Sequence, residues 1–353
     1  MIATMSLSGV RVLDLTRLLP GAFCTMQLAE LGADVIKVEE PETGDYMRWT
    51  PPMVGGRSAL FEALNRNKRS LVLDLKTEHD REALLRLVET SHVLVEGNRP
   101  GVMDRLGLGW NVLHGRNARL VMCSITGYGQ TGPYARRAGH DINYMAIAGG
   151  LGLNGERDGP PLPLSVQVAD VGGGGLQAAV AILAALVAVN RGEAGRWLDV
   201  SMTDGATTWL ALAFAARAGG EVVRRGDQRL AGRYACYRVY RCKDGGYYSV
   251  GALEPKFWSA LCVAVGRTDL VARQYEEGPD VQRAMEEVFA SLTREEWETK
   301  LSGLDACCEP ALDLDEVASH PQVVARGLLS PREGRAPGLG EHTEEILREI
   351  GIS

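Results

Sequence analysis

Short apolar runs alternate with helical patterns through the N-terminal half of the sequence. Runs of this kind are typical of strands that are buried on both faces of a parallel sheet. The predicted strands are Val10–Leu15, Asp34–Val38, Leu71–Leu75, His92–Glu96, Leu120–Ile125 and Leu198–Met202. The predicted helices between them include Ala22–Leu31, Glu78–Glu89, Val171 to about Asn190, and Thr203 through Arg217. The alternation predicts an α/β fold with a doubly wound, Rossmann-like parallel sheet, whose ligands bind beyond the carboxyl ends of the strands.

The pattern changes after Gly219–Gly232, a polar, arginine-rich stretch that we interpret as a linker. Tyr237–Arg241 and Tyr247–Val250 flank an Asp-Gly pair and predict a β-hairpin. Pro255 opens a helix, and Thr293 begins a capping-box motif for another.

The length of 353 residues exceeds a usual single core. We therefore expect a large Rossmann-like domain formed by residues 1–218 and 316–353, and a small α+β domain over residues 225–315. A final helix is expected at Glu344–Ile350, with Thr343 as its N-cap.

Composition excludes several classes of function. The net charge of -7 gives no basic surface for nucleic acid. The most apolar stretch, Ala178–Val189, is too short to span a bilayer, and Met1–Ser6 has no targeting pattern. The seven cysteines show no C-x2-C pair, so neither a metal site nor a disulfide framework is expected. A cytoplasmic protein with no nucleic-acid or membrane partner is predicted.

The loops at the expected carboxyl edge of the sheet carry cations. No G-x-G-x-x-G motif follows the first strand, which argues against a dinucleotide cofactor. The third strand is preceded by Asn65, Arg66, Asn67, Lys68 and Arg69, a set of amides and cations that suits a phosphate-rich ligand. The alternative is a solvated surface turn. Arg99 lies in a stiff Arg-Pro-Gly loop after the fourth strand. The same two interpretations, a phosphate ligand or a solvated turn, apply to it.

Two groups able to transfer protons stand about thirty residues apart in the sequence. His140 lies in the run Gly139–Tyr144, and Asp170 precedes four glycines, Gly172–Gly175. A histidine titrates near neutrality unaided, whereas a carboxylate needs burial to be raised toward that range. The pair could thus act as base and acid on opposite faces of a carbon. The alternatives are a structural histidine and an aspartate that only caps the following helix.

Several stretches resemble the class III CoA-transferase superfamily over nearly the whole chain. The shared stretches are Leu7–Leu15, Leu31–Glu39, Leu64–Ser70, Asn98–Val102 and Thr126–Pro133. Two further stretches, Ala138–Tyr144 and Val250–Phe257, resemble the α-methylacyl-CoA racemases of that superfamily. Some racemases carry arginine where this sequence has Glu39–Glu40. Asn65–Arg69 has the fuller transferase form, and Gln167–Asp170 is also closer to the transferases.

The resemblance implies an acyl-CoA substrate, with CoA part of the substrate and no separate cofactor. It also implies an interlocked homodimer, with each active site between one subunit's large domain and the other's small domain. His140 and Asp170 match the acid–base pair, and Glu254 matches a glutamate bonded to the histidine. The expected substrate- and CoA-binding residues are Asn65, Arg66, Asn67, Lys68, Arg69, Arg99, Asp141, Asn143, Tyr144, Gly172 and Gly173.

The implied reaction is the interconversion of 2R and 2S epimers of a 2-methylacyl-CoA through an enolate. Each member of the pair then needs a pKa on the order of 6 to 7. N–H groups at the helix start near Asp170 are expected to hold the enolate oxygen. In the transferases the position of Asp170 is instead the nucleophile, so inter- or intramolecular CoA transfer is an alternative, as is a non-catalytic acyl-CoA-binding paralogue.

Overall fold

The structure is a computed structural model of the whole chain, and it describes residues 5–329 and 334–352. The chain forms two compact units. Unit 1 comprises residues 1–151, 163–212 and 332–353, and unit 2 comprises residues 152–162 and 213–331. The segment 152–162 and the two helices within residues 314–325 thus belong to unit 2, in contrast to the boundaries expected from sequence.

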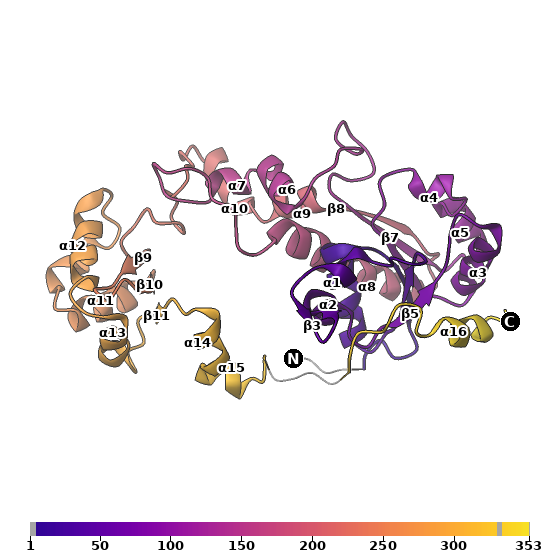
Figure 1. Cartoon of the computed structure of the whole chain (residues 1–353). Coiled ribbons are helices and arrows are strands. Elements are labelled where there is room, and N and C mark those ends of the chain that lie inside the picture. The colour runs from indigo at the N-terminus through magenta and orange to yellow at the C-terminus, as the bar shows by residue number, and fades with distance from the viewer. Residues whose placement is uncertain (1–4, 330–333, 353) are drawn as a thin grey trace. The chain divides into compact units, whose positions relative to one another are not determined.

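Unit 1 is built on a six-stranded parallel sheet in the order β5-β2-β1-β6-β7-β8 (Figure 1). The strands are β1 (Arg11–Leu15), β2 (Asp34–Glu39), β5 (Arg69–Val72), β6 (Val93–Glu96), β7 (Val121–Thr126) and β8 (Trp197–Ser201). Counted along the chain, this is the Rossmann order 3-2-1-4-5-6, and the order reverses between β1 and β6. The prediction of an α/β fold with a doubly wound parallel sheet is confirmed. One strand is shifted, since β5 starts at Arg69 and not at Leu71.

Helices cover both faces of this sheet because successive strand residues point to opposite sides. On one face, Val12, Val95 and Cys123 pack with α1 and α8, and on the other, Leu13 and Leu94 pack with α3 and α5. The helical segments of unit 1 are α1 (Leu18–Glu30), η1 (Tyr46–Trp49), α2 (Ala59–Asn65), α3 (Glu78–Glu89), α4 (Val102–Arg105), α5 (Trp110–Arg116), α6 (Asp141–Ala148), α7 (Gly150–Leu153, which runs into unit 2), η2 (Val168–Leu176), α8 (Gln177–Asn190), α9 (Met202–Thr208), α10 (Ala211–Ala218, which also runs into unit 2) and α16 (Thr343–Glu349). A small hairpin, β3 (Met53–Val54) and β4 (Arg57–Ser58), was not expected.

The helix expected from Val171 starts earlier and differently. Its first part, η2, is a π-helix, and α8 continues it, so a helical stretch runs from Val168 to Asn190. It is the one stretch among the described residues that is long and apolar enough to cross a membrane. Half of its apolar part is buried inside the protein. Contacts with α1, α9 and β7 place it within the core of unit 1. A buried core helix can have the same length and apolar composition as a membrane span.

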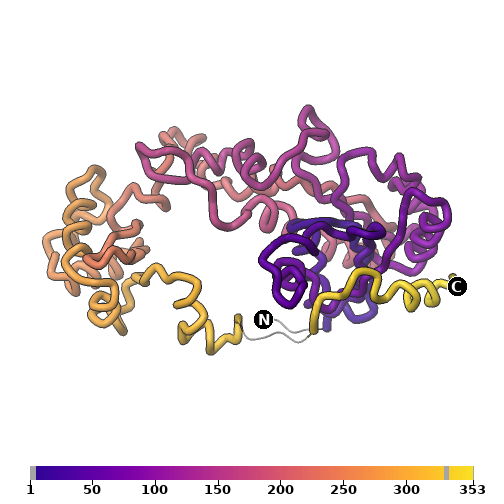
Figure 2. The backbone as a smooth tube through the Cα atoms, viewed as in Figure 1, coloured from indigo at the N-terminus to yellow at the C-terminus, as the bar shows by residue number. Residues whose placement is uncertain are grey.

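The C-terminal segment returns to cover β5, the edge strand of the sheet. Figure 2 shows this yellow segment running beside the indigo part of unit 1. His342 N–H donates to the Ser70 carbonyl, and Thr343 Oγ1 accepts from Val72 N–H, so backbone groups at the edge are satisfied. The N-cap of α16 is His342; the expected N-cap role of Thr343 was wrong because its hydroxyl is used by β5.

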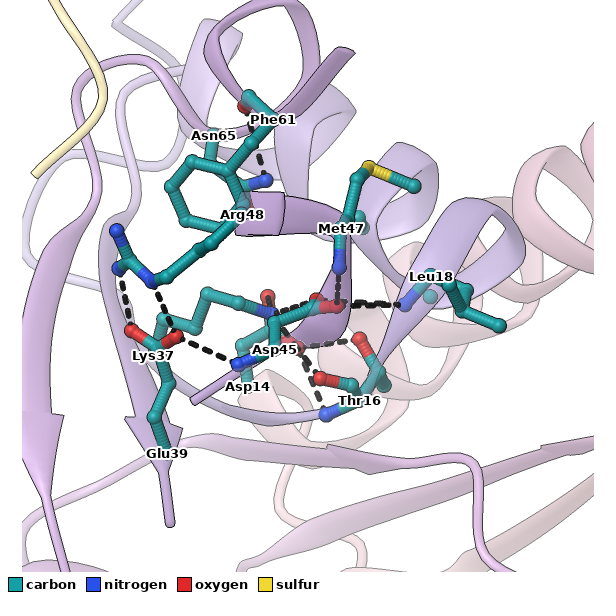
Figure 3. Close-up of polar contacts among 12 residues, drawn as sticks. Asp14, Thr16, Leu18, Lys37, Glu39, Asp45, Met47, Arg48, Phe61 and Asn65 are labelled. Carbon is teal, nitrogen blue, oxygen red and sulfur yellow. Dashed lines mark hydrogen bonds and ion pairs between the residues drawn. The ribbon is translucent and has the colours of Figure 1, made fainter. Parts of the chain in front are cut away.

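Buried ion pairs join the carboxyl ends of β1 and β2. Lys37 Nζ lies 3.0 Å from Asp45 Oδ2 and 4.0 Å from Asp14 Oδ2, and Lys68 Nζ lies 3.1 Å from the same Asp14 oxygen. Figure 3 shows Lys37 reaching the cluster that contains the two aspartates. Asp45 also accepts from Leu18 N–H, at a left-handed residue with φ of 61°. Two ammonium groups and two hydroxyls hold the pKa of Asp14 well below its usual range despite burial.

Unit 2 contains a three-stranded antiparallel sheet in the order β11-β10-β9. The strands are β9 (Tyr237–Arg241), β10 (Tyr247–Gly251) and β11 (Cys308–Pro310), and the remaining helical segments are α11 (Pro255–Ala264), η3 (Thr268–Arg273), α12 (Pro279–Phe289), α13 (Arg294–Leu301), α14 (Leu314–Ser319) and α15 (Pro321–Ala325). The predicted hairpin and the capping box at Thr293 are confirmed.

The arginine-rich stretch 219–232 is an ordered part of unit 2. The Arg225 guanidinium donates to the carbonyls of Gly152, Glu156 and Gly159. These bonds join the arginine-rich stretch to the segment 152–162 of the same unit. The interpretation of 219–232 as a linker was therefore wrong.

Candidate active site

His140 stands directly before helix α6 as its N-cap residue. Its backbone N–H donates to Asn143 Oδ1 at 3.1 Å, which satisfies a donor at the helix start. The side chain of His140 is exposed. Asn143 thus fixes the backbone that carries the imidazole.

Tyr144, a residue of α6, binds the backbone that precedes this helix. Its hydroxyl donates to the Gly139 carbonyl at 2.5 Å, and its ring lies edge-on to Tyr128. A Cβ atom at Gly127 would lie 2.3 Å from Tyr144 Cε1, and one at Gly139 would lie 2.7 Å from the same atom. Both glycines are needed because the ring occupies the space of a side chain there.

Asp170 lies in the first turn of η2 and not at its N-cap, which is Gln167. The alternative that Asp170 caps the helix is wrong. Asp141 Oδ1 accepts from the N–H groups of Ala169 and Asp170, at 2.7 and 3.1 Å. These donors at the helix start are therefore occupied, and the expectation that they hold an enolate oxygen is not supported.

The four glycines after Asp170 pack against neighbouring helices. A Cβ at Gly172 would lie 2.5 Å from the Trp209 ring, one at Gly173 would lie 2.6 Å from the Met202 carbonyl, and one at Gly175 would lie 2.7 Å from the Pro20 carbonyl. The glycines allow η2 to approach α1 and α9 closely. The predicted contact of Gly172 and Gly173 with substrate stays a prediction.

One cavity of about 310 Å³ brings the proton-transfer candidates together. His140, Asp141 and Asp170 supply its charged and titratable lining, and the other lining residues are Ile142, Met145, Leu151, Pro163, Leu164 and Gln167. Burial, with the nearby Asp141 charge, raises the pKa of Asp170 to about 7. The site therefore combines an imidazole and a carboxyl that gains and loses a proton near neutral pH.

The apolar lining residues were missed by sequence reasoning. Met145 follows Asp141 by one helical turn, so the period of α6 could have placed it on the same face. Leu151 lies in the four-residue helix α7, Pro163 and Leu164 lie in a connecting segment, and no periodic signal marks these positions.

Arg99 is an exposed cation in the loop after β6, at the point where the strand order reverses. Among the described residues it has no ion-pair partner. The pKa of Tyr144 is raised to about 12, mainly by burial and then by the charge of Asp170. The Arg99 charge acts in the opposite direction and lowers the pKa of Tyr144. Arg99 is thus close enough to act on Tyr144, and no ion pair among the described residues occupies its guanidinium.

The cluster Asn65–Arg69 is engaged within the protein more than expected. Lys68 is buried in the ion pair with Asp14, and Asn65 accepts from Lys68 Nζ at 2.8 Å. Arg69 binds Asp34 and Glu349. These three side chains hold the fold together and are not free phosphate ligands. Arg66 is half-buried and Asn67 is exposed, so the predicted CoA contact rests on these two.

Glu254 belongs to unit 2, where it is the N-cap residue of α11. Its exposed side chain makes no capping hydrogen bond. It is therefore not committed to the helix start, and its expected bond to His140 stays a prediction.

A model of CoA-transferase family III matches residues 7–343. The chain is 37% identical to the α-methylacyl-CoA racemase of Homo sapiens, over 99% of this chain and 94% of that protein. It is also 30% identical to the human succinyl-CoA:glutarate CoA-transferase, over 98% of this chain and 86% of that protein. A solved CAIB/BAIF family protein from Brucella suis matches with a TM-score of 0.83 and 31% identity, covering 98% of this chain and 99% of the other.

Proposed function

Because this chain belongs to CoA-transferase family III, we propose that it is an acyl-CoA racemase that interconverts the 2R and 2S epimers of a 2-methylacyl-CoA. The observation that carries the proposal is the shared cavity of His140 and Asp170, with the pKa of Asp170 raised to about 7. The similarity to α-methylacyl-CoA racemases supports it.

The thioester acidifies the α-carbon of the substrate, and one member of the pair removes that proton. The planar enolate is then protonated on its other face by the other member. His140 serves the 2S epimer and Asp170 the 2R epimer. A carboxyl with a pKa near 7 suits both halves of this cycle, since it is a competent base in one direction and a competent acid in the other. The proposed reaction requires no cofactor beyond the CoA of the substrate.

Arg99, Arg66 and Asn67 are proposed to contact the CoA part of the substrate, and Tyr144 and Asn143 to shape the site around His140. Arg99 is the main support for the predicted CoA contact because it is exposed and has no ion pair among the described residues. A guanidinium forms forked bonds with phosphate oxygens.

A homodimer is proposed as the active form in the cytoplasm, with Glu254 of one subunit bonded to His140 of the other. Its support in unit 1 is an apolar surface on α6, α8 and the region of α10. The exposed residues there are Ile142, Ile147, Val180, Val187, Trp209 and Leu212. A partner surface that covered these side chains would remove their apolar area from water. Sedimentation velocity that gives only a monomer at micromolar concentration would contradict the dimer.

CoA transfer with Asp170 as nucleophile is the second candidate, because relatives of similar identity are CoA-transferases. Incubation of the protein with a 2-methylacyl-CoA in deuterated water separates the two. Racemisation places deuterium at C2 without any acceptor acid. Absence of label, together with passage of CoA to an added carboxylic acid, would replace the racemase proposal with the transferase.

A further inference from the structure

Glu96 is a buried carboxyl group that the proposed reaction does not use. It ends β6 at the point where the strand order reverses, and its residue is 3% exposed. No ion pair of the described residues includes it. Burial raises its pKa. Burying a carboxyl group without a neighbouring cation costs folding free energy unless hydrogen bonds compensate for the lost water. The hydrogen bonds of Glu96 are therefore of interest.

The contacts of Glu96 reach the loop that carries Arg99. Glu96 Oε2 accepts from the backbone N–H of Asn98 at 2.7 Å. Ser124 lies opposite Glu96 in the register of β6 and β7, and its hydroxyl acts against burial by lowering the pKa of the Glu96 carboxyl. Ser124 Oγ in turn accepts from Trp197 Nε1 at 2.9 Å. Glu96 therefore holds the backbone of the residue before Arg99 from the carboxyl end of β6.

The other side of Arg99 is fixed by a tight turn. The Arg99 carbonyl accepts from Val102 N–H at 3.1 Å, and Gly101 has φ of 82° and ψ of 0°. With Pro100 at the second position, this is the geometry of a type II turn, which needs a glycine at its third position. The backbone of Arg99 is thus held on one side by Glu96 and on the other by this turn.

Glu96 and Arg99 also line one small cavity, of about 160 Å³, beside Ser124 and Trp197. The Arg99 side chain is exposed at its edge and acts on Tyr144 electrostatically. The loop therefore presents a guanidinium, unpaired among the described residues, that acts on Tyr144 from a backbone fixed on both sides.

We propose that Glu96 is a positioning residue, which holds the Asn98–Arg99 backbone so that Arg99 meets the acyl-CoA ligand. The inference rests on the proposed function only for the identity of that ligand. The amide of a glutamine can accept from Asn98 N–H as the carboxyl does, whereas a methionine of similar volume cannot.

The first measurement needs no ligand. Hydrogen exchange of the peptide covering residues 97–102 is compared in wild type, E96Q and E96M. We expect faster exchange in E96M and near-normal exchange in E96Q. Unchanged exchange in E96M would overturn the proposal, whatever reaction the protein catalyses. L84A, a core substitution in α3, controls for general destabilisation and should leave this peptide protected.

The second measurement is the Kd of a non-reactive CoA thioester analogue by calorimetry. We expect E96M to weaken binding by about tenfold, the scale set by one lost hydrogen bond to a buried group. In an R99A background E96M should add no further loss, because its effect passes through Arg99. An equal loss in the R99A background, or no loss in wild type, would overturn the proposal. If the wild-type protein itself binds the analogue weakly, acyl-CoA is not the ligand. The role of Glu96 is then tested by the hydrogen-exchange measurement alone.

Discussion

The carboxylate of Asp141, at the start of α6, accepts the backbone N–H of Asp170, at the start of η2, at 3.1 Å. A second bond, from Ala169 N–H at 2.7 Å, strengthens the link. Asp141 follows His140 in the chain, so one side chain joins the two segments that carry the candidate acid–base pair. Its charge also helps to raise the pKa of Asp170.

Replacement of Asp141 by Asn should keep an acceptor for the two N–H groups but remove the charge. The pKa of Asp170 then falls, and its base form exists at lower pH. We expect the acidic limb of kcat for exchange of the 2R epimer to move to lower pH. A pH–rate profile in deuterated buffers measures this, and an unmoved limb would show that the Asp141 charge does not act on the reacting group.

Replacement of His140 by Ala should lower racemisation by about 10²- to 10⁴-fold, the usual contribution of a positioned general acid–base group. H79A is the matched control, because His79 is an exposed residue on α3. Any CoA transfer through Asp170 should survive in H140A and vanish in D170N. Loss of racemisation in H79A as well would point to a damaged fold.

Replacement of Asp170 by Asn should stabilise the protein at pH 8. The folded-state pKa of about 7 lies above the ordinary value of 3.8, so the folded protein binds the extra proton and stability falls as pH rises from about 4 to 7. The penalty is complete above pH 7 and absent below pH 4. Urea unfolding should show D170N more stable than wild type at pH 8 and equal to it at pH 4. A constant difference at both pH values would contradict the raised pKa.

Replacement of Asp14 by Asn should destabilise unit 1 by about 3–5 kcal/mol, because removal of one member of a buried pair leaves an uncompensated charge. Lys68 is the main charge left behind, so the double variant D14N/K68M should recover part of the loss. The depressed pKa of Asp14 also means that its contribution is present above pH 3.8 and is lost as pH falls further. Chemical denaturation measures the free energy of unfolding of both proteins. A difference below about 1 kcal/mol, the value of a surface ion pair, would count against a stabilising role of the buried ion pairs.

Replacement of Gly173 by Ala should lower the Tm and kcat together. The new Cβ would lie 2.6 Å from the Met202 carbonyl and 2.8 Å from Ala206 N, both of them backbone atoms that cannot yield locally. G115A, in α5, is the control, because a Cβ there meets nothing within 4 Å. Alanine in place of an exposed helical glycine stabilises by about 1 kcal/mol. Equal Tm values for the two variants would refute the close packing of η2.

Local pattern was enough to predict the elements of the large unit. The strands β1, β2, β6 and β7 lie where apolar runs predict them, and α3 has the predicted bounds, because buried parallel strands and amphipathic helices leave periodic signals. The strand order, by contrast, depends on which strands pair across the sheet, and no single run encodes that.

The candidate site divides in the same way. The sequence alone singled out His140 and Asp170 as chemistry-bearing residues and their motifs as those of CoA-transferase family III. Only the tertiary structure decided that both line one cavity, that Asp141 occupies the N–H groups at the start of η2, and that Lys68 is buried in an ion pair while Arg99 stays unpaired among the described residues. A residue type fixes what a side chain can do, but burial and neighbouring charges, which come from distant parts of the chain, determine its pKa and its partners.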